Sequence, residues 1–160
     1  MFGRLGRLLN NVKKLDEQKI FIEIVSIDNI ERFILDLNRV DQLFDDGVTS
    51  FGDPLPVYSP ITEGFALDKV FTVSTETGGT LSKEKKFGER YNLFASGEMF
   101  SSFRLIVDDG GFVIDAQTIK GDVDYEKKYK ILGITDENKS KISERILPLV
   151  VNKVKRILLS

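Results

Sequence analysis

The sequence predicts an α+β fold in which N- and C-terminal helices pack on a small, mostly antiparallel sheet. Two observations lead to this prediction. Apolar residues recur every three or four positions near both ends of the chain, which is the spacing of amphipathic helices, and a sharp hairpin signal lies at residues 103–116. Residues 1–160 are expected to form a single domain, because 160 residues suffice for one hydrophobic core.

The composition excludes several classes of site. The chain has no cysteine and no histidine, which rules out disulfides, Ser-His and Cys-His catalysis, and metal sites that need these ligands. We therefore expect no enzymatic activity and no cofactor. The net charge of -2 gives no overall attraction to nucleic acid or acidic lipid. Residues 1–14 are too polar for a signal peptide or a membrane span, so we expect a protein made in the cytoplasm with no membrane partner.

An amphipathic first helix is predicted over residues 2–15. Its apolar side chains include Phe2, Leu5 and Leu9, while its basic residues lie largely on other faces. A basic helix of this kind can bind a membrane surface or nucleic acid. Packing on the fold or on a neighbouring subunit is the favoured interpretation, because acidic residues follow at once.

A helical period continues over residues 20–37, although QKIFIEIV alone would also suit a strand. Residues 37–44 fit either a strand or a helix end, and Asp-Asp-Gly at 45–47 then begins a loop. The aspartates there invite a calcium site, but they lack the alternating register of an EF-hand, which favours a solvated turn. Ser59-Pro60 predicts the start of a further helix over residues 61–69.

Strands are predicted at residues 70–75 and 90–93, separated by a polar, glycine-rich insertion at residues 76–88. We interpret this insertion as a projecting arm that orders on contact with a neighbouring subunit, because it cannot bury enough apolar surface alone. The expected contacts are two apolar side chains, Leu81 and Phe87, and three cations that would meet an acidic partner surface, Lys83, Lys85 and Lys86.

The hairpin prediction rests on two β-branched and aromatic runs that flank an Asp-Asp-Gly-Gly turn within residues 103–116. Alternation along the strands places one set of apolar side chains on a shared face: Phe103, Leu105, Val107, Phe112, Ile114 and Ala116. Arg104 and Asp115 point the other way. Ile106 and Val113 make that second face partly apolar, so we expect it to be covered as well.

Several helix boundaries follow from capping signals. Ser96 is expected to cap a short helix before the hairpin, and Asp122 another helix that ends at Gly133. Thr135 is expected to cap a long apolar terminal helix. Because Pro148 lies inside this helix, where it removes a backbone hydrogen bond, we expect a kink there.

Four short blocks carry a family resemblance. They are Leu37-Asn38-x-x-x-Gln42-Leu43, Tyr58-Ser59-Pro60-x-Thr62, Ser96-Gly97-Glu98-Met99-Phe100-Ser101-Ser102-Phe103, and Tyr129 followed by Leu132-Gly133-Ile134-Thr135. In this order they resemble an uncharacterised set of small proteins of tailed bacteriophages and prophages. The third block is also similar to a segment of phage tail-completion and head-tail joining proteins, with Ser96 in place of threonine. The insertion at residues 78–88 departs from the pattern, and a second basic stretch before Ser96 is missing.

The resemblance implies a non-enzymatic virion structural protein, made in the host cytoplasm, that acts in the neck as a head-tail connector or tail-completion component. Its partners would be further copies of itself in a homo-oligomeric ring, and other virion proteins such as portal, adaptor or tail proteins. The apolar surface of the two terminal helices also favours self-association. Two alternatives stay open: a nucleic-acid-binding accessory module that uses the basic N- and C-terminal helices, and a hydrolase with paired carboxylates such as Glu98 and Asp115.

Overall fold

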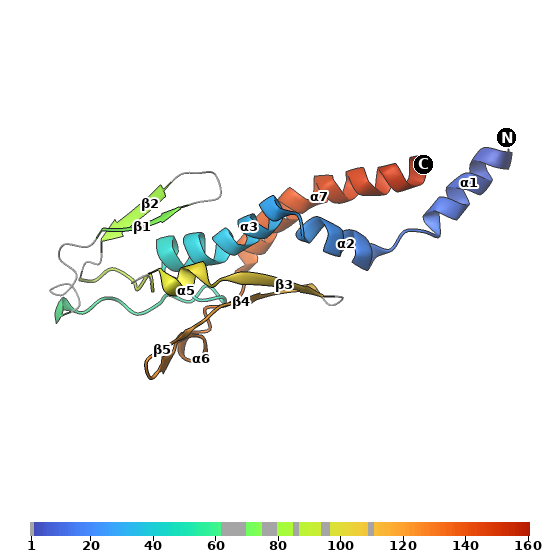
Figure 1. The fold of residues 1–160 in the computed structure, drawn as a ribbon. Helices are drawn as coiled ribbons and strands as arrows, with labels where there is room; N and C mark the ends of the chain where they lie inside the picture. Colours follow the sequence, from blue (N-terminus) through green and yellow to red (C-terminus); the bar gives the residue numbers. More distant parts are fainter. Residues whose placement is uncertain (1, 62–69, 75–79, 85–86, 94–96, 109–110) are drawn as a thin grey trace.

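The computed structural model describes residues 2–61, 70–74, 80–84, 87–93, 97–108 and 111–160. It has an α+β fold with helices at both ends of the chain, as predicted. The molecule is elongated, and α1 (Phe2–Val12) lies at the same end as the C-terminal half of α7 (Asp136–Leu159) (Figure 1). The strands of the described residues form three separate two-stranded antiparallel sheets instead of a single sheet.

Two short helices replace the continuous helix expected over residues 20–37. α2 (Glu17–Val25) begins after Asp16, whose carboxylate accepts a hydrogen bond from the backbone N–H of Lys19 at 3.0 Å and so satisfies a donor that the helix start leaves free. After a short break, α3 (Asp28–Asp36) follows. The apolar period continues across this break because both helices direct isoleucines into one core.

The segment that fitted either a strand or a helix end forms a π-helix, η1 (Leu37–Asp46), which continues directly from α3. Gly47 ends it with a left-handed φ of +60°. A Cβ atom at this position would lie 2.6 Å from the Cβ of Arg90, so only glycine fits without movement. An irregular loop follows, and residues 60–61 are helical. The rest of the helix predicted over residues 61–69 falls outside the described residues.

The insertion holds a strand instead of separating two strands. β1 (Val70–Ser74) pairs in antiparallel register with β2 (Thr80–Glu84). The strand expected at residues 90–93 is therefore wrong, and Arg90 makes only an isolated bridge with Val57. Pairing within the insertion closes a much shorter loop than pairing across it, which lowers the entropic cost of the hairpin.

The central hairpin is confirmed. β3 (Arg104–Asp108) pairs with β4 (Gly111–Asp115) in the expected register. The predicted inner face packs on the core through Phe103, Leu105, Val107, Phe112, Ile114 and Ala116. On the opposite face, the guanidinium Nε of Arg104 donates to the Asp115 carboxylate at 2.8 Å across the two strands.

The short helix before the hairpin is α5 (Glu98–Ser101), and Gly97, with a left-handed backbone, precedes it. Ser96, the expected cap, lies outside the described residues. Thr135 caps α7 as predicted. Pro148 does lie within α7, and the kink there stays a prediction.

A small hairpin changes the cap of the next helix. β5 (Ile119–Lys120) pairs with β6 (Val123–Asp124), and this turn contains Asp122. The cap of α6 (Tyr125–Tyr129) is therefore Asp124, whose carboxylate accepts from the N–H of Lys127 at 3.1 Å. The prediction of Asp122 was wrong because the strand pair takes up the residues before the helix.

Buried amides hold the segment between α6 and α7. α6 ends at Lys130, in a left-handed conformation, and not at Gly133 as expected. The carbonyl of Gly133 accepts hydrogen bonds from the side chains of Asn38 at 2.7 Å and Gln42 at 3.0 Å. The Gln42 side chain also accepts from Asn138 at 3.1 Å. These bonds tie η1 to the start of α7.

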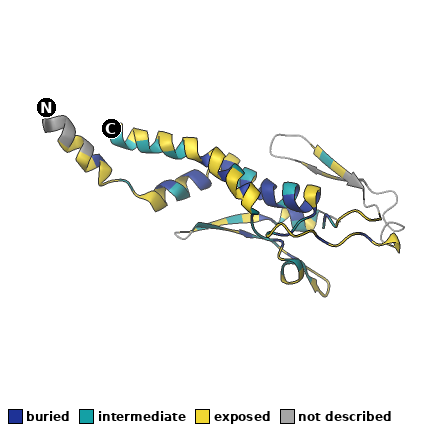
Figure 2. Cartoon of the chain, turned by 180° about the vertical axis from the view of Figure 1, so that it is seen from behind, coloured by how far each residue is buried: buried dark blue, intermediate teal, exposed yellow. Residues whose placement is uncertain are grey.

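The core lies where α2, α3 and η1 meet the hairpin and the first half of α7 (Figure 2). The largest fully buried apolar side chains are Phe44, Ile30, Ile34, Leu43 and Ile131. Each contributes about 1.5–3 kcal/mol through removal from water. On the C-terminal half of α7 and on the outer face of the hairpin, some apolar side chains remain exposed: Val151, Leu159, Ile106 and Val113.

Candidate subunit interface

The first helix supplies part of the predicted contact surface. α1 packs against α7, where the Asn11 side-chain amide donates to the carbonyl of Leu158 at 3.4 Å. Leu9 remains exposed after this packing. Phe2 and Leu5 lie in α1, but their side chains are outside the described set. The helix thus contacts the fold on one side and presents apolar surface on another.

The predicted arm divides into an ordered strand and an exposed apolar residue. Leu81 lies in β2, is half-buried and packs against the core, so it is not an open contact. Phe87 is 60% exposed. Lys83 belongs to β2, with its side chain outside the described set, and Lys85 and Lys86 are not described. Of the two predicted apolar contacts, Phe87 is the one that a neighbour can reach.

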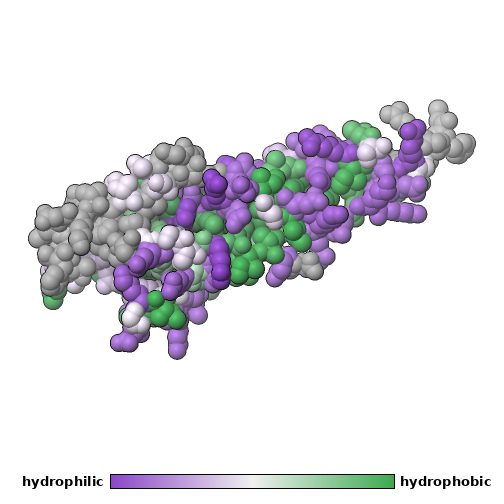
Figure 3. All heavy atoms as spheres, in the orientation of Figure 1, coloured by the Kyte–Doolittle hydropathy of each residue, from purple (hydrophilic) through white to green (hydrophobic). Residues whose placement is uncertain are grey.

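The outer face of the hairpin is open, which corrects the expectation that it is covered. Ile106 and Val113 are paired across the strands and are 45% and 58% exposed. α7 adds Leu147, Val151 and Leu159. The sequence does not single out these helix residues because apolar side chains occur on both the packed and the open side of α7. Figure 3 shows apolar side chains in a band between hydrophilic areas on one face of the molecule.

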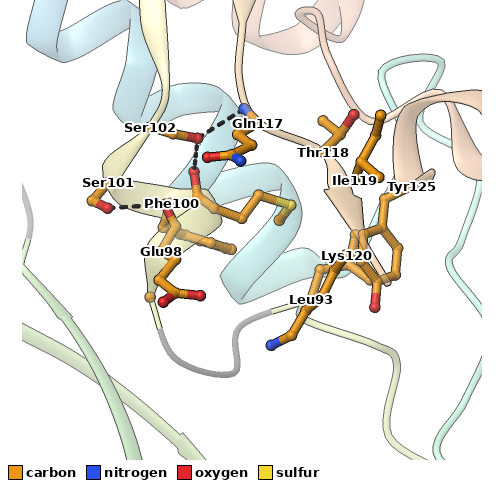
Figure 4. Close-up of a pocket in the computed structure, with 12 residues that line it drawn as sticks. Leu93, Glu98, Phe100, Ser101, Ser102, Gln117, Thr118, Ile119, Lys120 and Tyr125 are labelled. Atoms are coloured by element: carbon orange, nitrogen blue, oxygen red, sulfur yellow. Dashed lines mark hydrogen bonds between the residues drawn. The ribbon is translucent and has the colours of Figure 1, made fainter. Parts of the chain in front are cut away.

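A pocket of about 460 Å³ lies between α5, the β5 segment and α6 (Figure 4). Its lining includes Glu98, Lys120 and Tyr125. The hydroxyl of Ser101 donates to the carbonyl of Glu98 at 2.9 Å, and that of Ser102 donates to the carbonyl of Met99 at 2.7 Å. Because these hydroxyls bond to backbone carbonyls and not to a general base, the geometry gives neither serine the activation of a nucleophile.

The carboxylates named for the hydrolase alternative have separate surroundings. Asp115 forms an ion pair with Arg104, whereas Glu98 lies in the pocket wall. Burial raises the pKa of Asp41, and the Lys141 ammonium at 3.7 Å opposes this shift. Among the described residues, no group of three or more acids is arranged to hold a metal ion.

Described residues of the four sequence blocks hold the fold together. The hydroxyl of Tyr58 donates to the side-chain oxygen of Asn92 at 2.9 Å and accepts from the Asn92 N–H at 3.2 Å. Burial raises the pKa of Tyr58 to about 12. The hydroxyl of Ser102 accepts from the N–H of Gln117 at 2.9 Å, which fixes α5 to the segment between β4 and β5. The blocks therefore have structural roles.

Comparisons with known proteins give no relative. No protein-family model matches the chain, and neither a curated protein nor a solved structure matches it. Within the part of the chain that the structure describes, none of the helices combines the length and the apolar character needed to cross a bilayer.

Proposed function

We propose that this chain is a non-enzymatic structural protein of a tailed-bacteriophage virion, a neck component of the head-tail connector or tail-completion type. It acts through contacts between subunits in a homo-oligomeric ring and through contacts with portal, adaptor or tail proteins. The support from sequence is the ordered set of four blocks. The structure adds that block residues such as Asn38, Gln42 and Tyr58 stabilise the fold.

One observation carries the proposal: a single copy leaves large apolar side chains exposed on several separate elements. They lie on α1, on the loop that holds Phe87, on the outer face of the β3–β4 hairpin and along α7, where Leu159 is 80% exposed. Extended apolar surface on a small protein is typical of subunit interfaces. Assembly into a larger particle would cover it.

The proposal is tested in two steps. Native mass spectrometry of the purified chain should show a homo-oligomer, and mass spectrometry of purified particles from a producing host should detect the chain as a stoichiometric component. Phe87→Ser should weaken assembly without unfolding the monomer, because the Phe87 side chain is exposed. Ile119→Ser, at an exposed apolar position of β5 outside these elements, is the matched control. Absence from the particles would reject the virion assignment.

A nucleic-acid-binding module is the second candidate, favoured by one arrangement. Because α1 packs on α7, the exposed cations Lys13 and Lys14 lie at the same end of the molecule as Lys155 and Arg156. DNA binding through them would lose affinity steeply with salt. Fluorescence anisotropy of a labelled duplex at several salt concentrations measures this dependence. Absence of binding at low salt would remove the candidate.

A further inference from the structure

One end of the elongated molecule carries an excess of acidic residues. Residues 40–61 contain Asp41, Asp45, Asp46 and Asp53 and no basic residue. Lys141 pairs with the first of these aspartates, and the other three are exposed. Glu89 is also exposed and lies near these aspartates. The next residue, Arg90, donates a hydrogen bond to the carbonyl of Asp46 at 3.2 Å. We call this surface, with exposed Val57 and Phe87, the acidic end.

The opposite end has the reverse charge. Residues 2–15 contain two arginines and two lysines and no acid, and residues 146–160 contain three cations and no acidic side chain. Of these last three, Lys153 pairs with Glu23 at 2.6 Å. We call the surface formed by Lys13, Lys14, Lys155 and Arg156 the basic end. Figure 1 places it, at α1 and the C-terminus, far from the end of η1.

The two ends also match in apolar character. A shallow hollow of about 590 Å³ lies at the basic end, lined by Asn152, Lys155, Arg156, Leu159 and Ser160. Leu9 and Leu159 are exposed beside the cations. At the acidic end, Val57 and Phe87 are exposed beside the carboxylates. Each end therefore combines apolar side chains with an excess of one sign of charge, the arrangement in which charge fixes orientation and apolar contact gives affinity.

We propose that the acidic end of one copy binds the basic end of the next copy. This inference rests on the proposed function, because it names the contact that would build the ring. Each copy uses its two ends toward two different neighbours, so the contact is heterologous. Such contacts form a closed ring when the rotation between copies closes, and a filament when it does not. An antiparallel isologous pair would also join opposite ends, but it would stop at a dimer, which native mass spectrometry distinguishes from a ring.

The test is an exchange of charges in the full-length chain. One variant carries Asp46→Lys and Glu89→Lys, and the other carries Lys155→Glu and Arg156→Glu. Each double substitution removes most of the net charge of one end, so association of the variant alone in sedimentation velocity should weaken at least about tenfold relative to the wild type. In an equal mixture, the unchanged acidic end of one variant meets the unchanged basic end of the other. Mixed dimers should therefore form.

Two control variants change the net charge equally away from both ends. They are Asp122→Lys with Glu144→Lys, and Lys120→Glu with Lys127→Glu, all at exposed positions. They should associate like the wild type, and circular dichroism should show that every variant is folded. The inference is overturned if the wild type is monomeric, if the end variants associate normally, if the mixture forms no mixed dimers, or if the controls weaken association equally. Detection of the chain in purified particles judges the proposed function separately.

Discussion

At the residue scale, three buried amide side chains join segments that are far apart in the sequence. Asn38, Gln42 and Asn138 connect η1 with the loop before α7 and with α7 itself. No sequence signal revealed this network, because an Asn or Gln between apolar residues is normally assigned to the solvent-facing side of a regular helix. The π-helical backbone changes which side chains point inward. An unpaired buried partner would cost about 1–3 kcal/mol, so the network is sensitive to substitution.

Gly47 provides a test of close backbone packing. Gly47→Ala should destabilise the fold by more than the roughly 1–2 kcal/mol that a left-handed conformation costs a residue with a Cβ, because the new Cβ would also meet Arg90. Gly121→Ala is a matched control, with a φ of +59° and nothing within 4 Å of the added Cβ. Urea unfolding measures the free energy of unfolding of both variants. Equal losses of stability would mean that the segment around Arg90 moves aside freely.

Tyr58 should make stability depend on alkaline pH. Burial raises its pKa from 10.0 to about 12, so the folded state favours the neutral phenol. This contribution is fully present below about pH 10 and is lost as the pH rises toward 12. Urea unfolding at several pH values should show a steeper alkaline decline for the wild type than for Tyr58→Phe. Parallel curves for the two proteins would contradict the assignment.

At the element scale, the strands differ in how far sequence predicts them. The register of β3–β4 was predictable because its turn residues and its alternating side chains agree. The partner of β1 was not, since several segments had similar strand character and the choice depended on loop closure. The same limit applies to the candidate interface. The exposure of Phe87 fitted the expectation, whereas Leu81 packs inward, which residue type alone does not distinguish.

Adjacent residues of β4 test which face of the hairpin is buried. Ile114 is 4% exposed and Val113 is 58% exposed. Ile114→Thr should lower the free energy of unfolding by about 2 kcal/mol or more, because it removes apolar contacts and buries a hydroxyl. Val113→Thr should change it by less than about 0.5 kcal/mol. Urea unfolding of both variants measures the two losses. A larger loss for Val113→Thr than for Ile114→Thr would mean that the outer face is the packed one.

At the scale of the whole molecule, acidic and basic residues lie at different ends of an elongated shape, although the net charge of the chain is small. The net charge of -2 predicts no strong electrostatic interaction. The fold places the acidic stretch, residues 40–61, and the two basic stretches, residues 2–15 and 146–160, at opposite ends. The two ends of the long axis therefore differ in the sign of their charge. This arrangement depends on the packing of α1 against the C-terminal part of α7. The cationic segments are separated by most of the sequence, and their meeting could be seen only in the structure.

Salt should therefore weaken association of the wild type. Raising ionic strength from 0.1 M to 1 M shortens the screening length from about 10 Å to about 3 Å, which removes much of the attraction between acidic and basic ends. Sedimentation equilibrium should show an association constant at least about tenfold lower at high salt. The Lys155→Glu, Arg156→Glu variant is the matched comparison: its altered end has little net charge, so salt should change its association much less than that of the wild type. If salt instead strengthens association of the wild type, apolar contact governs assembly and the opposed charges have no part in it.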